Sequence, residues 1–165
     1  MKFNYFDKDL EYSLDSRDDD LFDSFYKRIF PNITKIEFCS DLETQKKGID
    51  KIIYFKNGNK FTLDEKKRRR WYGDILLEIW SDNKIRKPGW LLKSTCDYIV
   101  YAVMPTRKIY LLPNILLKKA YITNKDKWLS YKPIFAQNPN YITESRAVPV
   151  NELLTAISIE MEQNI

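Results

Sequence analysis

Asp50, Asp64 and Lys66 are the residues whose types and spacing offer chemistry in this sequence. Asp50 stands just before a β-rich run, and Asp64 and Lys66 follow the next turn, at the end of a second such run. Two neighbouring carboxylates can hold Mg²⁺, which prefers oxygen ligands and keeps several of its waters. A metal held in this way polarises a phosphodiester oxygen and acidifies a bound water, and a nearby ammonium group can orient that water. The three residues therefore predict metal-assisted hydrolysis of phosphodiesters.

The same three residues also have a simpler interpretation, as a cluster of surface ion pairs. Charged residues make up 31% of the chain, so an acid two positions before a lysine arises readily by chance. An exposed ion pair stabilises a fold by only about 0–1 kcal/mol. The spacing alone leaves both interpretations open.

A predicted β-hairpin decides whether these side chains meet. Asn57-Gly58-Asn59 is a strong turn signal, and it separates two runs rich in β-branched and aromatic residues. A two-residue turn places Asp50 opposite Glu65, whereas a three-residue loop over positions 57–59 places Asp50 opposite Lys66. The two runs are residues 51–56 and 60–64.

Side-chain alternation favours the three-residue loop, because a one-residue slip turns every side chain to the other face of the hairpin. The longer loop creates one face that is apolar except for Lys51 and Glu65 at its far end. In this register Asp64 pairs with Ile52, and Asp50 is its diagonal neighbour, within reach of a shared ligand. The apolar members of the face that ends in Lys51 and Glu65 are Ile53, Phe55, Phe61 and Leu63, and the opposite face carries Asp50, Asp64 and Lys66.

Periodicity and turn residues predict a mixed α/β domain around this hairpin. A helix from about residue 18 carries Leu21, Phe22, Phe25, Tyr26 and Ile29 on one face and ends at Pro31-Asn32. Residues 41–47 are mostly polar and are expected to form a loop. The further expected elements are a strand or ordered arm over 1–16, a short strand over 33–39, a strand or short helix over 75–80, a hairpin over 98–104 and 108–112, a helix from Pro113 and a helix over 150–162.

The order of these residues resembles the PD-(D/E)xK nuclease superfamily, which has the restriction-endonuclease-like fold. The resemblance rests on Gly48-Ile49-Asp50, the hairpin and then Leu63-Asp64-Glu65-Lys66, and it covers roughly residues 18–112. It implies a central mixed β-sheet flanked by helices, with Mg²⁺ or Mn²⁺ held by Asp50 and Asp64 and with Lys66 at the attacking water. Ile49 stands where the superfamily's name places proline.

The resemblance leaves three assignments open. In a rival frame, Glu65-Lys66-Lys67, Glu65 is the metal ligand and Lys67 is the lysine. Glu78 is either a further ligand or a buried partner for an arginine. Asp18, on the apolar face of the first helix, is either an additional acid of the site or a helix cap.

A run of five basic residues, from Lys66 to Arg70, directly precedes Trp71-Tyr72. Basic side chains contact phosphates, and aromatic rings stack on unpaired bases. The run therefore predicts nucleic-acid contacts next to the metal site, and the alternative is a solvated strand end with Trp71 in the core. The residues predicted to contact nucleic acid are Lys67, Arg68, Arg69 and Arg70.

Composition narrows the class of protein. The chain has no histidine, which excludes Ser-His-Asp catalysis and His-ligated zinc, and its two cysteines, Cys39 and Cys96, are expected to be reduced packing residues. Residues 31–130 carry a net charge of +10 between two acidic ends, a balance that suits a surface meeting phosphate. A length of 165 residues predicts one domain over 1–165, and the lack of a charged and apolar leader or a spanning segment predicts a cytoplasmic protein with no membrane partner.

Together these observations predict a Mg²⁺- or Mn²⁺-dependent endo- or exonuclease that hydrolyses DNA, with RNA as the alternative substrate. The oligomeric state is left open, and a dimer is compatible with the sequence. The competing interpretation is a non-catalytic protein of nuclease fold that binds nucleic acid or a protein partner. A third is a basic interaction protein whose carboxylates balance its lysines.

Overall fold

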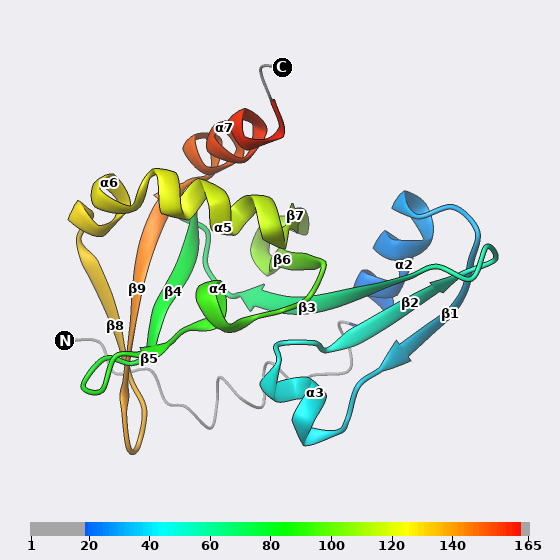
Figure 1. Ribbon diagram of the computed structural model, residues 1–165, viewed down its shortest axis with the longest axis horizontal. Helices are drawn as coiled ribbons and strands as arrows, with labels where there is room; N and C mark the ends of the chain where they lie inside the picture. Colours follow the sequence, from blue (N-terminus) through cyan, green and yellow to red (C-terminus); the bar gives the residue numbers. More distant parts are fainter. Residues whose placement is uncertain (1–18, 163–165) are drawn as a thin grey trace.

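The computed structural model describes residues 19–162 of the chain, so the predicted arm over 1–16 and Asp18 lie outside the described residues (Figure 1). Helices and strands alternate irregularly along the described part. The elements are α2 (Asp19–Ile29), β1 (Ile33–Phe38), α3 (Leu42–Lys46), β2 (Lys51–Phe55), β3 (Lys60–Arg68), β4 (Asp74–Asp82), β5 (Lys87–Pro88), α4 (Trp90–Lys93), β6 (Tyr98–Val103), the 3₁₀ turn η2 (Met104–Thr106), β7 (Lys108–Pro113), α5 (Asn114–Thr123), α6 (Lys125–Ser130), β8 (Pro133–Gln137), β9 (Ile142–Pro149) and α7 (Val150–Met161).

The strands form two sheets, which corrects the expectation of one central sheet. The first has the order β1-β2-β3-β6-β7 and is mixed, because β3 runs parallel to β6 while the other pairs are antiparallel. The second, of order β5-β4-β9-β8, is antiparallel throughout. Residues 131–149, to which no element was assigned from sequence, form β8 and β9 and so complete the second sheet. The mixed α/β class is confirmed.

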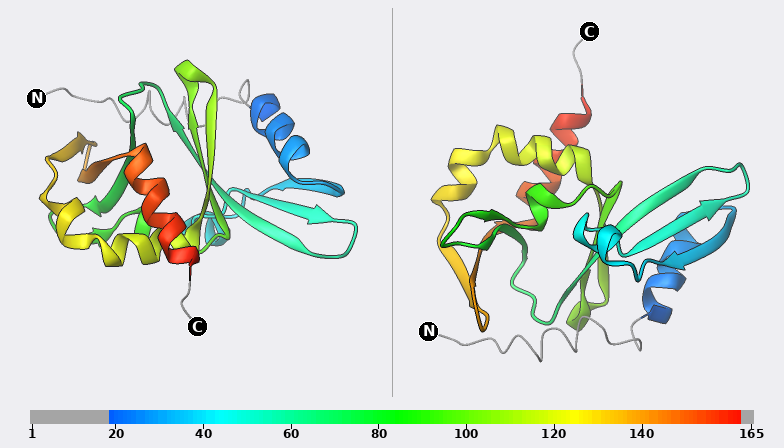
Figure 2. Two further views of the ribbon diagram at one scale, coloured as in Figure 1. Left: turned by 90° about the horizontal axis from the view of Figure 1, so that it is seen from above. Right: turned by 60° about the horizontal axis from the view of Figure 1, so that its bottom comes forward.

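Two apolar cores hold these layers together. Helix α2 buries Phe22, Phe25 and Tyr26 against one face of the mixed sheet, as the spacing in the sequence predicted. The other face of that sheet packs toward the second sheet and the helices α5, α6 and α7, with Trp128 of α6 fully buried. Figure 2 shows α2 on one side of the mixed sheet, with α5 to α7 and the second sheet on the other. Among the described residues no helix combines the length and apolar character needed to cross a bilayer.

The β2–β3 hairpin has a three-residue loop as predicted, but the loop occupies Lys56-Asn57-Gly58 instead of positions 57–59. Tyr54 pairs with Lys60, and the Phe55 amide donates to the Asn59 carbonyl at 3.0 Å. Gly58 has a φ of +83°, which a three-residue hairpin loop requires of its last residue. The glycine therefore fixes the loop, and each pairing shifts by two positions while every side chain keeps its predicted face.

Helix α3 replaces the loop expected over residues 41–47. Asp41 caps it by accepting a hydrogen bond from the Thr44 amide at 2.8 Å. The helix is only five residues long and buries none of them. Its sequence therefore has no periodic pattern of apolar residues from which a helix could be predicted. The capping aspartate was its only signal.

Candidate functional site

Asp50 lies where the β2–β3 ladder ends. Lys51 pairs with Leu63, and the Asp50 amide also donates to the Leu63 carbonyl at 2.8 Å, so the register of β2 breaks at this point. One carboxylate oxygen of Asp50, Oδ2, accepts a hydrogen bond from the Glu65 amide at 2.7 Å. The Asp50 side chain thus continues the bonding of β3 where the backbone of β2 stops, and this holds its carboxylate beside β3.

Asp64 and Lys66 share the face of β3 that is turned away from α2. The Lys66 ammonium donates to Oδ1 of Asp64, whereas Oδ2 of Asp64 is buried without a hydrogen-bond partner among the described residues. Burial raises the pKa of Asp64 to about 6; Lys66 opposes the rise, and the neighbouring Asp50 carboxylate adds to it. Asp64 is only 1% exposed, and it lies beside a second carboxylate. A cation bound between the two carboxylates would offset the cost of burying their negative charge.

Lys66 stays an ammonium group in this setting. Burial alone would lower the pKa of Lys66, but Asp64, Asp50 and Glu78 together raise it above its ordinary value. Lys66 is therefore suited to donate hydrogen bonds and to balance negative charge, and not to remove a proton from water.

Glu78 reaches the same cluster from β4, in the other sheet. Its Oε1 accepts a hydrogen bond from the Trp90 amide at the start of α4, at 3.1 Å. Burial raises the pKa of Glu78, while the Trp90 amide, Lys66 and Lys93 act in the opposite direction. The sequence left two roles open for Glu78, a metal ligand or a partner for a buried arginine. Within residues 19–162 Glu78 has no arginine partner, and its carboxylate lies near Lys66.

Within the described residues, no three His, Cys, Asp or Glu side chains are grouped so as to hold a metal by themselves. Asp50 and Asp64 would therefore supply two protein ligands, and the remaining positions would belong to waters and to the substrate. Mg²⁺ is commonly bound in this way, by one or two carboxylates together with waters and phosphate oxygens.

Gly89 lets α4 approach Glu78. A Cβ atom at this position would lie 2.4 Å from the Glu78 carbonyl oxygen and 2.7 Å from its Cγ. We predict that Gly89→Ala lowers the free energy of unfolding by about 1–3 kcal/mol through overpacking, and also reduces any activity of the site because Glu78 must move. Urea unfolding and cleavage rates measure the two effects. Gly58→Ala, which strains a loop with no atom nearby, should lower stability without changing cleavage.

Glu65 lies on the opposite face of β3, against α2, which corrects its assignment as a metal ligand. The Tyr26 hydroxyl donates to Oε1 of Glu65 at 2.5 Å, and Lys51 pairs with the same oxygen at 3.2 Å. Lys51 also lies 3.4 Å from Asp23. Lys67, on the same face, lies over the Phe22 ring at 5.8 Å. Glu65 and Lys67 therefore face α2, whereas Asp64 and Lys66 lie together on the other face of β3.

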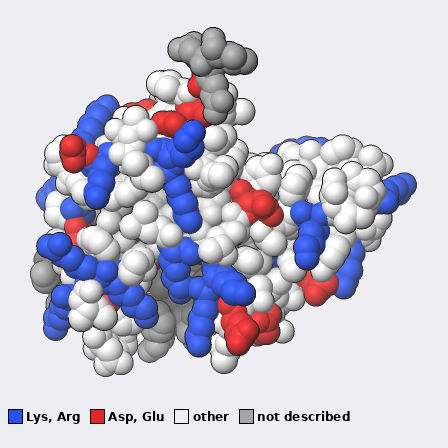
Figure 3. Space-filling model, viewed as in Figure 1, with Lys and Arg blue, Asp and Glu red and all other residues white. Residues whose placement is uncertain are grey.

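The basic run does not form a row of open phosphate contacts. Arg68 binds the carboxylate of Asp74 and donates to its carbonyl at 3.0 Å, so it joins β3 to the start of β4. Lys67 and Arg69 also interact with groups of the protein, and only Arg69 and Arg70 are exposed. On the face shown in Figure 3, basic side chains lie near α4 and between α4 and α3, and others are spread over the side of α5, α6 and β8, while acidic side chains lie at α3.

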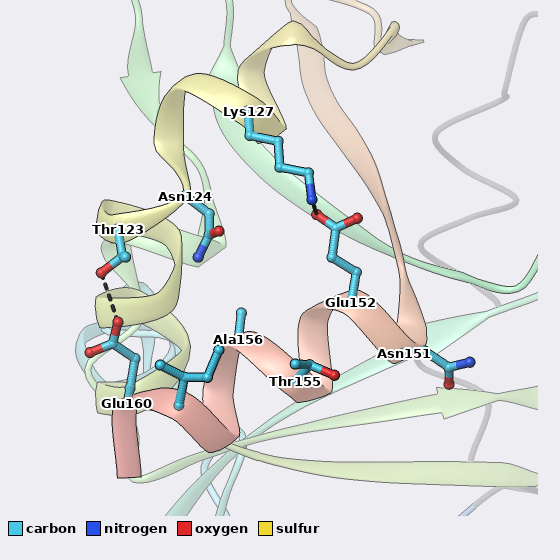
Figure 4. Close-up of a pocket in the computed structure, with 9 residues that line it drawn as sticks. Thr123, Asn124, Lys127, Asn151, Glu152, Thr155, Ala156 and Glu160 are labelled. Atoms are coloured by element: carbon cyan, nitrogen blue, oxygen red, sulfur yellow. Dashed lines mark hydrogen bonds and ion pairs between the residues drawn. The ribbon is translucent and has the colours of Figure 1, made fainter. Parts of the chain in front are cut away.

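A cavity of about 430 Å³ lies elsewhere, between α7 and the α5–α6 pair (Figure 4). Its two carboxylates are already engaged: Glu152 pairs with Lys127 at 3.0 Å, and Glu160 accepts a hydrogen bond from Thr123 at 2.7 Å. None of the residues predicted for the site lines this cavity. It is therefore separate from the Asp50–Asp64–Lys66 cluster.

Comparisons with known proteins identify no relative. No protein-family model matches the sequence, and neither a curated protein nor a solved structure is significantly similar to it. Any function must therefore be argued from the residues and their geometry.

Proposed function

We propose that this protein is a Mg²⁺-dependent nuclease that hydrolyses phosphodiester bonds in DNA. The observation that carries the proposal is the buried Asp64 carboxylate, whose Oδ2 has no hydrogen-bond partner among residues 19–162 and which lies beside Asp50 and Lys66. The resemblance of these residues to the PD-(D/E)xK superfamily supports the same activity. A merely structural ion pair would not need a second carboxylate next to the first, because like charges in a buried place destabilise a fold.

Asp50 and Asp64 would hold the metal, which supplies Lewis acidity toward a phosphodiester oxygen and acidifies a bound water. Lys66 donates a hydrogen bond that orients the attacking water, and its charge stabilises the negative charge that develops on the phosphorus oxygens. Asp64 holds Lys66 in place through their ion pair. The Glu65 amide fixes Asp50.

Metal binding is expected to depend on pH with a definite sign. The raised pKa of Asp64 means that a proton competes with the metal below about pH 6, so Mn²⁺ affinity should rise as the pH increases through that value. Calorimetric titration with Mn²⁺ at about pH 5 and about pH 7.5 measures the difference. Asp64→Asn should bind Mn²⁺ weakly at both pH values. Equal affinity in this variant and the unmodified protein would contradict the assignment.

Cleavage itself is tested with plasmid, single-stranded DNA and RNA, each with Mg²⁺, with Mn²⁺ and with a chelator. We expect cleavage of DNA that requires the metal. Binding without cleavage in every arm would instead favour the non-catalytic protein of nuclease fold.

A further inference from the structure

Three exposed lysines, Lys46, Lys47 and Lys93, stand on the two short helices next to the candidate site or directly after them. Within residues 19–162 their side chains form no ion pair and no hydrogen bond. We call these residues the α3–α4 lysines. Their ammonium groups are therefore exposed and available to a bound anion.

The backbone around these lysines is held firmly. The Lys47 carbonyl accepts hydrogen bonds from the Thr95 amide at 2.8 Å and from the Thr95 hydroxyl at 3.2 Å. The Ser94 hydroxyl donates to the Gly48 carbonyl at 3.0 Å, and a Cβ on Gly48 would lie 2.8 Å from that hydroxyl oxygen. The loop after α3 is thus locked to the loop after α4, and the lysines are carried on one fixed surface.

This surface adjoins the catalytic cluster. Lys47 is three residues before Asp50, and Lys93 lies near enough to Glu78 for its charge to oppose the rise that burial causes in the pKa of Glu78. Figure 3 shows basic side chains near α4 and between α4 and α3, beside the acidic side chains of α3. The surface and the candidate metal ligands therefore lie side by side.

We propose that the α3–α4 lysines bind the phosphates of the DNA strand on one side of the bond that is cut. Lysines that meet phosphates position a nucleic acid without reading its sequence. The α3–α4 lysines replace Lys67 and Arg68 as the main phosphate contacts, since those two side chains lie over Phe22 and against Asp74. The placement of the DNA strand beside the bond that is cut rests on the proposed function. The binding of DNA by these lysines does not rest on it.

The test is DNA binding in the presence of a chelator, so that no cleavage occurs. The triple variant Lys46→Ala/Lys47→Ala/Lys93→Ala is compared with Lys56→Ala/Lys60→Ala/Lys132→Ala, which removes three other exposed lysines and the same net charge. Fluorescence anisotropy with a labelled duplex measures affinity over a range of salt concentrations. Circular dichroism checks that both variants are folded.

We expect the α3–α4 variant to bind DNA at least about tenfold more weakly. The slope of its plot of log affinity against log salt concentration should be less negative by nearly three, because about three phosphate contacts are lost. The control variant should stay within about twofold of the unmodified protein. Equal losses in both variants, or none in either, would overturn the inference. Because no metal is present, these results do not depend on whether the protein cuts DNA; a protein that binds through these lysines but never cuts would refute the nuclease proposal alone.

Discussion

Asp50→Asn is expected to abolish Mg²⁺-dependent DNA cleavage while leaving the protein folded. The asparagine side chain still offers an oxygen to the Glu65 amide, so the hydrogen bond that ends the β2–β3 ladder survives. The negative charge is lost, and with it a ligand for the metal. We expect a fall in rate of ~1000-fold, equivalent to about 4 kcal/mol of transition-state stabilisation. Initial rates on plasmid DNA at saturating Mg²⁺ measure the loss.

Lys66→Ala and Lys67→Ala form a matched pair that tests the frame. The two lysines are neighbours in β3, but Lys66 pairs with Asp64 whereas Lys67 lies over the Phe22 ring on the α2 side. Only Lys66→Ala should lose cleavage. Cleavage lost in Lys67→Ala and kept in Lys66→Ala would point to the Glu65–Lys67 frame, and cleavage kept in Asp50→Asn would remove the metal assignment altogether.

The shared face of Asp64 and Lys66 could be foreseen because side-chain alternation has a period of two. The true register differs from the predicted one by two positions, so the paired residues of β2 and β3 kept their faces although each pairing changed. The two-position difference arises at Gly58, because its positive φ makes it the last residue of the loop. The pattern of apolar residues gives no information on this backbone angle.

The second sheet was missed for a different reason. Ile134 and Phe135 of β8 are exposed at adjacent positions, so the strand lacks the alternation that marks one buried face. Its partner β9 buries Glu144, Ser145 and Arg146 in succession, which reads as a polar loop in sequence. The pairing of the Glu144 carboxylate with Arg146 at 2.6 Å, which allows this burial, depends on tertiary structure.

The polar cluster under α2 did have a signal in the sequence. Lys51 and Glu65 were the two charged residues on an otherwise apolar hairpin face, and the structure joins them at 3.2 Å. Charges at such positions are expected to be paired when buried. The third member, the Tyr26 hydroxyl, comes from a helix, and no local pattern places it there.

Lys51→Met should be among the most destabilising substitutions in this protein. The Lys51 side chain is 6% exposed and that of Glu65 11%. Removing the ammonium group therefore leaves a buried carboxylate whose one remaining partner in the described part of the chain is the Tyr26 hydroxyl. Breaking a buried pair from one side costs about 3–5 kcal/mol. Urea unfolding at neutral pH measures this loss. Lys35→Met, which breaks the exposed Lys35–Glu37 pair, should change stability by less than about 1 kcal/mol.

The pH dependence of this loss has a predictable sign. Burial raises the pKa of Glu65 in the folded protein, while Lys51 and the Tyr26 hydroxyl hold it down. Without Lys51 the pKa of Glu65 rises further, so the folded variant takes up a proton more readily than the unfolded chain does. Its stability is therefore favoured at low pH and lost as the pH rises through the folded pKa. The deficit of Lys51→Met should be smaller at about pH 5 than at about pH 7.5. A deficit independent of pH would show that Lys51 acts through its cation–π contacts with the Phe22 and Tyr26 rings and not through the charge of Glu65.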